Sequence, residues 1–231
     1  MKLGIMQPYF MPYIGYFQLM KAVDKYVIYN DVNYINRGWV ARNNILISGK
    51  KQLFTISLQG ASQNKLFTEI QVLDDFRKLV KTLEMNYLKA PFFQPTMSVM
   101  EKIFSFPNKR LDLFIKNSFE QILSYLNVYT ELILSSDINK NNSLKGQEKI
   151  LELCKILKAD TYYNAIGGKE LYDKKEFEDN GISLHFLKTD ENLRYKQFLN
   201  MEFVPNLSII DVLMFNSVEE VNKMLDDYFL E

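Results

Sequence analysis

The chain has 231 residues, 47% of them apolar and 14% aromatic, which is enough to build the core of one large domain. Its 28 basic and 28 acidic residues balance, so no net charge attracts it to nucleic acid or to an anionic membrane. The first apolar run is too short for a signal peptide, and no stretch approaches the roughly 20 apolar residues that span a bilayer. With only one cysteine, Cys154, the sequence predicts a cytoplasmic protein without disulfides or membrane insertion.

The first 31 residues contain the pattern strand, loop, helix and strand. Residues 2–6 form an apolar run that stops at Pro8, since proline cannot donate to the hydrogen bonds of a sheet. Residues 14–22 have apolar side chains at helical spacing, and residues 25–31 are rich in aromatic and β-branched side chains. This pattern predicts a βαβ unit, in which the two strands are parallel and the crossover is right-handed.

The middle of the chain predicts a hairpin followed by helices. Residues 44–58 contain two strand-like runs around a turn at residues 48–51. Residues 74–127 follow a helical pattern. Breaks in this pattern are expected at three prolines, Pro91, Pro95 and Pro107. We interpret the stretch as a helical insertion within a single α/β domain that covers residues 1–231.

Alternation of strands and helices returns in the last hundred residues. Strands are predicted at residues 132–134, 161–164 and 182–186, and helices at residues 147–157 and 174–179. The chain from Ser208 onward is predicted to be helical, with Ser208 as N-cap and Asp211 as its capping-box partner. Together with the first βαβ unit, these elements predict an α/β fold with a Rossmann-like, mostly parallel sheet.

The loop at residues 7–16 gives the strongest local indication of a functional site. In open α/β sheets ligands bind beyond the carboxyl ends of the strands, where loops meet helix N-termini. Gln7 and Tyr9 are predicted to bind substrate there. Gly15 stands in the first turn of the following helix, where glycine costs about 1 kcal/mol relative to alanine, which suggests a close approach by a ligand or by another part of the chain.

This loop is placed like the entry loop of nucleotidylyltransferases, which has two histidines flanking a glycine. Tyr13 and Tyr16 stand at the corresponding positions, so we consider Tyr13 a catalytic candidate and Tyr16 a substrate contact. The histidines that handle phosphate in those enzymes are missing. The alternative is that the tyrosines of this loop are packed aromatic residues.

A second candidate segment, residues 31–44, begins at the end of the second strand. It supplies a carboxylate that can act as a general base, two guanidinium groups that suit phosphate or carboxylate, an aromatic ring that can stack on a base or sugar, and an orienting amide. These groups belong to Asp31, Arg37, Arg42, Trp39 and Asn43. The alternative is a solvated loop that Trp39 anchors in the core.

Two further segments supply weaker candidates for substrate binding. A strand that runs into a Gly-Gly-Lys turn can expose backbone N–H groups to an anion, although the spacing is not that of a P-loop. The candidates in these segments are Gly167, Gly168, Lys169, Tyr172, Tyr195 and Gln197.

The remaining reactive side chains are expected to be structural. His185, the only histidine, lies within a predicted strand, and Cys154 lies on the apolar stripe of a predicted helix. A catalytic triad built on either residue is not indicated. The acidic residues show no metal-binding spacing, and the sequence identifies no cofactor, although a Mg²⁺ ion that enters with the substrate is compatible with it.

Several short segments resemble, in the same order, the WbqC-like protein family. They include residues 5–10 and 12–19, the pairs at 31–32, 38–39, 42–43 and 167–168, residues 87–91, Tyr172, Tyr195, Gln197 and residues 207–211. Members of this family are associated with bacterial surface-polysaccharide and O-antigen gene clusters. The resemblance therefore implies a role in making or decorating an activated sugar, but it carries no catalytic residue set.

Three functions are compatible with these observations. The leading hypothesis is a transferase that modifies a nucleotide-linked amino sugar, by acyl or aminoacyl transfer to the sugar amine. The second is a nucleotidyltransferase or adenylating enzyme, which the entry loop suggests. The third is a sugar-binding scaffold protein without catalytic activity. The sequence does not predict the sugar, the donor or the oligomeric state.

Overall fold

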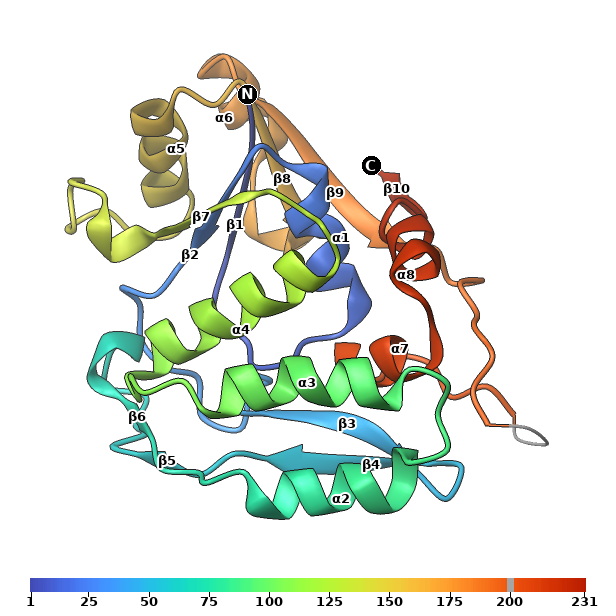
Figure 1. The fold of residues 1–231 in the computed structure, drawn as a ribbon. Coiled ribbons are helices and arrows are strands. Elements are labelled where there is room, and N and C mark those ends of the chain that lie inside the picture. Colours follow the sequence, from blue (N-terminus) through green and yellow to red (C-terminus); the bar gives the residue numbers. More distant parts are fainter. Residues whose placement is uncertain (199–201) are drawn as a thin grey trace.

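A computed structural model of the protein describes residues 1–198 and 202–231. Its centre is a six-stranded sheet in the order β10-β9-β8-β1-β2-β7 (Figure 1). The strands are β1 (Lys2–Met6), β2 (Lys25–Ile28), β7 (Glu131–Leu134), β8 (Thr161–Ala165), β9 (Ser183–Thr189) and β10 (Tyr228–Leu230).

All strand pairs of this sheet are parallel except β9 with β10. The order β7-β2-β1-β8-β9 is the 3-2-1-4-5 order of doubly wound sheets, so the predicted Rossmann-like fold is confirmed. The strand order reverses between β1 and β8, because β2 and β7 follow on one side of β1 while β8 and β9 follow on the other, which makes the carboxyl ends of β1 and β8 the topological switch point. The predicted βαβ unit is also confirmed, since β1 and β2 are parallel neighbours on either side of helix α1 (Ile14–Ala22) in the chain.

Each face of the sheet carries its own apolar core, as the alternation of side chains along a strand requires. Leu3, Ile5 and Val27 pack in the core that includes residues of α5 (Gly146–Leu157) and α6 (Lys174–Asp179). The intervening Tyr26 and Ile28 belong to the core on the α1 side, where α8 (Val218–Leu225) and α4 (Leu111–Tyr125) also contribute. Figure 1 shows these two groups of helices on either side of the sheet.

The chain between β2 and β7 forms a layer beyond the carboxyl ends of the strands (Figure 1). It consists of the hairpin β3 (Arg42–Ile47) with β4 (Lys50–Thr55), the short pair β5 (Leu58–Gln59) with β6 (Gln71–Val72), and the helices α2 (Arg77–Tyr87), α3 (Phe93–Phe104) and α4. The predicted hairpin and helices are therefore present. The turn is tighter than predicted, because Ser48 and Gly49 alone connect the strands, both with positive φ.

One proline prediction is wrong for a simple reason. Pro95 lies at the third residue of α3, in the first turn, where its missing N–H is not needed by the helix. The expected interruption therefore does not occur there. Pro91 and Pro107 do lie outside the helices, between α2 and α3 and between α3 and α4.

The C-terminal part differs from its prediction at the end of the chain. Ser208 caps α7 (Ile209–Phe215), as expected, and Ser217 caps α8. After α8, however, β10 adds an antiparallel strand beside β9 instead of continuing as helix. No helix of the described residues is long and apolar enough to cross a membrane.

Gly15 makes the close approach that its position suggests, and the partner is the protein itself. A Cβ atom at this position would lie 2.5 Å from Thr189 Oγ1 and would also overlap the ring of Tyr13. Thr189 Oγ1 donates a hydrogen bond of 2.6 Å to the buried amide of Gln18, so it is not free to rotate away. Glycine at the start of α1 thus lets the loop, the helix and β9 come together.

We expect Gly15→Ala to lower the free energy of unfolding, because overpacking costs about 1–3 kcal/mol and outweighs a helix-propensity gain of about 1 kcal/mol. Urea denaturation measures this change. The matched control is Gly167→Ala, where a new Cβ would meet no atom within 4 Å, and its effect should stay within about 0.5 kcal/mol. An unchanged or higher stability of Gly15→Ala would show that the contact imposes no constraint.

Candidate functional site

The loops that follow β1 and β2 are bound to each other, as the parallel pairing of the two strands predicts. The backbone N–H of Phe10 donates to the carbonyl of Val40 at 2.8 Å. The side-chain amide of Asn43 donates to the carbonyl of Met11 at 2.7 Å. The two segments that carry most of the predicted site residues therefore form one surface at the carboxyl edge of the sheet.

These loops enclose a cavity of about 360 Å³, which we call the aromatic pocket. Its lining residues are Tyr9, Pro12, Tyr13, Trp39, Asn43 and Asn206. Four of the six are predicted site residues, whereas Asn206 comes from the segment before α7 and was not predicted. Among the described residues, no charged side chain lines this pocket, and its size lies within the usual range for small ligands.

Arg42 holds the loop that carries Trp39. Its guanidinium donates through Nε to the carbonyl of Gly38 at 2.9 Å and through Nη2 to the carbonyl of Arg37. The guanidinium carbon also lies 5.8 Å from the centre of the indole ring, which is half exposed. Arg42 is thus engaged with its own loop, and Arg37 is an exposed turn residue with φ of 58°.

Asn43 lines the pocket and also binds the backbone on either side of it, with one N–H and one lone pair of its amide. Its Oδ1 accepts from the N–H of Asn44 at 2.8 Å, while its Nδ2 is bound to Met11. The same Met11 carbonyl also accepts from Ser208 Oγ at 2.8 Å. Because Met11 has a positive φ of 49°, these two donors stabilise an uncommon backbone conformation in the pocket-forming loop.

The three tyrosines of the first loop have different environments. Tyr9 and Tyr13 line the aromatic pocket, and burial raises the pKa of both hydroxyls, so they are neutral hydrogen-bond donors at pH 7. Tyr16 is buried instead, its ring packs against Tyr26, and its hydroxyl donates to the carbonyl of Gln7. The structure therefore places Tyr16 in the core, outside the pocket lining, and Gln7 is half-buried at the end of β1.

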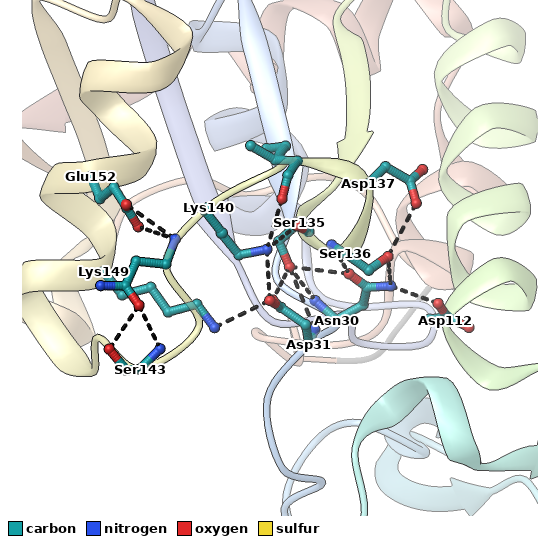
Figure 2. A network of polar contacts seen from close by, with 12 residues as sticks. Asn30, Asp31, Asp112, Ser135, Ser136, Asp137, Lys140, Ser143, Lys149 and Glu152 are labelled. Atoms are coloured by element: carbon teal, nitrogen blue, oxygen red, sulfur yellow. Dashed lines mark hydrogen bonds and ion pairs between the residues drawn. The ribbon is translucent and has the colours of Figure 1, made fainter.

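Asp31, which follows β2, does not line the aromatic pocket but binds Lys140 of the segment after β7 and Lys149 of α5 (Figure 2). Its Oδ2 lies 2.7 Å from Lys140 Nζ and 3.1 Å from Lys149 Nζ, and Oδ1 accepts from Ser135. Burial raises the pKa of this carboxyl, but the hydrogen bonds from Lys140, Ser135 and Lys149 outweigh that effect, so the pKa is lowered.

Asn30, the residue before Asp31, is fully buried and fixes the segment that follows β7. Its Nδ2 donates to Asp112 at 2.7 Å and to Ser136 Oγ at 3.0 Å, and its Oδ1 accepts from the N–H of Ser136 at 3.0 Å. Figure 2 shows how the amide joins the end of β2 to the segment after β7 and to α4. Sequence reasoning missed Asn30 and both lysines, although a polar Asn-Asp pair directly after a buried strand is a signal for the first.

The glycine-rich candidates lie at the end of β8 and not in the pocket lining. Gly168 is packed against the Asn164 amide, since a Cβ there would lie 2.9 Å from Oδ1. Lys169 forms an exposed ion pair of 2.6 Å with Glu231. The Tyr172 hydroxyl lies 3.4 Å from the hydroxyl of Tyr162, and Gly167 borders open space.

Tyr195 and Gln197 bind a buried carboxylate of the protein. Asp211 accepts from Tyr87 Oη at 2.7 Å, from Tyr195 Oη at 2.5 Å and from Gln197 Nε2 at 2.9 Å. The capping-box prediction for Asp211 is therefore wrong: the backbone N–H of Ser208 donates to a neighbouring strand, while the carboxylate organises this cluster. Burial raises the pKa of Asp211.

The expected structural residues show no catalytic environment. His185 is half-buried in β9 with its ring edge-on to Tyr163, and burial lowers its pKa. Cys154 is buried in α5, where burial raises its pKa to about 12. Across residues 1–198 and 202–231 there is no cluster of three or more His, Cys, Asp or Glu side chains that could hold a metal ion.

Comparison with known proteins gives one family and one relative. The model of the WbqC-like protein family matches residues 7–223. Uncharacterized protein Rv1507c of Mycobacterium tuberculosis is 30% identical over 216 residues, which cover 92% of this chain and 92% of that protein. No solved structure matches the chain.

We expect Asp211→Asn to destabilise the protein by about 1–3 kcal/mol, because an amide cannot accept from all three donors and leaves a buried donor without a partner. Chemical denaturation followed by circular dichroism checks this. Asp179→Asn, which changes an exposed carboxylate in α6 to an amide, serves as control and should have an effect below about 0.5 kcal/mol. Equal stability of both variants would contradict the proposed organising role of Asp211.

The lowered pKa of Asp31 predicts a pH dependence with a definite sign. The ionised carboxylate contributes stability above its unfolded pKa of about 3.9, and this contribution is lost as the pH falls through the lower folded value. The stability difference between the wild type and Asp31→Asn should therefore be largest near neutral pH and narrow below about pH 4. Urea titrations between neutral and acidic pH measure it, and a difference that does not change with pH would contradict the ion pairs.

Proposed function

Because the chain belongs to the WbqC-like protein family, we propose that it is a transferase that modifies a nucleotide-linked amino sugar in the synthesis of bacterial surface polysaccharide. The group transferred would be an acyl or aminoacyl group, and the acceptor the sugar amine. The observation that carries this proposal is the aromatic pocket at the carboxyl edge of the sheet, beside the switch point where open α/β sheets bind their ligands.

The chemistry of the pocket suits a neutral ring with hydroxyl groups. The rings of Tyr9, Tyr13 and Trp39 offer flat apolar faces, against which the C–H face of a sugar or the face of a base can pack. Neutral tyrosine hydroxyls and the exposed Asn206 supply hydrogen-bond donors and acceptors at the rim. Among the described residues, the pocket lining contains no charged side chain. The charged part of a nucleotide sugar would therefore bind outside the pocket.

Within this proposal Tyr13 is the candidate for a catalytic contact. Its side chain is partly exposed at the pocket, and burial raises the pKa of its hydroxyl. A neutral phenol can donate a hydrogen bond to the oxygen on which negative charge develops during acyl transfer. Asp31 is a weaker base than a free carboxylate because its pKa is lowered, so we assign it to the positioning of lysines and not to proton abstraction.

A sugar-binding protein without catalytic activity is the second candidate. The observation in its favour is the same lining, which holds aromatic and amide groups but no strong base. The two functions differ in turnover. A transferase must form product when it is given a nucleotide sugar and an acyl donor. If Tyr13→Phe still binds the sugar but no longer forms product, the result would favour catalysis over simple binding.

We expect Trp39→Ala to weaken binding of a nucleotide-linked amino sugar at least tenfold, which corresponds to about 1.4 kcal/mol, because a stacking face is lost. Titration calorimetry with a panel of nucleotide sugars measures the change. Tyr129→Ala removes an aromatic ring that is 90% exposed and lies outside the aromatic pocket, and it should bind like the wild type. Absence of binding by any nucleotide sugar to the wild type would contradict the proposed function.

A further inference from the structure

The cluster of Asp31, Lys140 and Lys149 carries more positive than negative charge. The side chains of the two lysines are 2% and 7% exposed, and that of Asp31 is 13% exposed. Within residues 1–198 and 202–231, no other carboxylate lies within 4 Å of either ammonium group. Two ammonium groups thus share one carboxylate, and a buried excess charge is unfavourable unless a counter-charge is supplied.

The two lysines differ in how many hydrogen-bond acceptors surround their ammonium groups. Lys140 Nζ contacts Asp31, donates to the carbonyl of Ser135 and lies 3.4 Å from the carbonyl of Ile138, so each of its three protons has an acceptor. In the described part of the chain, Lys149 Nζ has one oxygen within hydrogen-bond distance, Asp31 Oδ2 at 3.1 Å. The Lys149 ammonium group also lies 5.2 Å from the centre of the Tyr29 ring.

The position of Lys149 in the chain adds to this imbalance. It is the fourth residue of α5, close to the helix N-terminus, where the macrodipole is positive and favours negative charge. A lysine in this place is disfavoured unless an anion lies nearby. Figure 2 shows Lys149 and Asp31 reaching toward each other from α5 and from the end of β2, at the carboxyl edge of the sheet.

We propose that Lys149, positioned by Asp31 and backed by Lys140, forms an anion subsite that binds a phosphate group. This inference rests on the proposed function only for the source of the phosphate, which would be the diphosphate of the nucleotide-linked substrate. The subsite and the aromatic pocket follow neighbouring strands, β2 and β1, so one extended substrate would place its ring and its charge in different environments. Lys149 would neutralise the diphosphate, and Asp31 would hold the ammonium group in place without touching the substrate.

Titration calorimetry with inorganic pyrophosphate tests the subsite without any sugar. The wild type should bind pyrophosphate, and Lys149→Met should weaken that binding at least tenfold, whereas Lys149→Arg should retain most of it because the charge is kept. Lys155→Met removes an exposed lysine of the same helix and should bind like the wild type. No pyrophosphate binding to the wild type, or equal binding by Lys149→Met, overturns the subsite.

The unliganded stability of Lys149→Met gives a second readout. If Lys149 is the excess charge, the variant keeps the Asp31–Lys140 pair and should melt at the same temperature as the wild type or higher. A melting temperature that is clearly lower, with unchanged pyrophosphate affinity, would identify Lys149 as a structural ion-pair residue and overturn the proposal. A crystal soaked with pyrophosphate must show the anion at Lys149 Nζ, and density elsewhere counts against it.

The outcomes separate this inference from the proposed function. Binding of a nucleotide sugar that depends on Trp39 but not on Lys149 would leave the transferase proposal intact and overturn the subsite. Binding of pyrophosphate at Lys149 without binding of any nucleotide sugar would do the reverse. Binding of malonate, a dicarboxylate of similar size, in place of pyrophosphate would overturn the assignment to phosphate.

Discussion

The site depends on the parallel pairing of β1 with a neighbour on each side. Parallel strands end at the same edge of a sheet, so the loops after β1, β2 and β8 must all emerge together. Leu3 and Ile5 of this strand pack in the core on one face of the sheet, and Met6 packs against the core on the other face. Polar groups that are far apart in sequence are thereby collected at one edge, and the layer between β2 and β7 covers them.

Within that frame the site divides its chemistry between two places. The described lining of the aromatic pocket after β1 is uncharged. Its loops are held by hydrogen bonds that the side chains of Asn43, Arg42 and Ser208 donate to backbone carbonyls. The cluster after β2 is charged, and its carboxylate keeps two lysines in fixed positions. Arg42 and Asn43, which were predicted to contact the substrate, form hydrogen bonds that fix the loops carrying the exposed pocket residues.

Much of the fold follows from periodicity, whereas the site follows only in part. The apolar run at β1, the β-branched residues of β2 and the alternation in the hairpin are local patterns, and they predict these elements and their parallel or antiparallel pairing. β10 was missed because three residues after a helix form a strand only when β9 is beside them. Lys149 was missed because it meets Asp31 across 118 residues, and the contact of Tyr195 with Asp211 was not predicted because Asp211 lies in another element. Two side chains that pair across a long stretch of sequence form no regular spacing, so a single sequence does not reveal that they are partners.

The hydrogen bond between Ser208 and Met11 has a consequence for how the protein is made. It joins residues 197 positions apart, and Asn206 of the pocket lining lies just before Ser208. A nascent chain from which residues 206–208 have not yet emerged therefore has no complete pocket, however well β1 and β2 have paired. The pocket is therefore completed only after residues 206–208 have emerged, whereas β1 and β2 can pair long before that.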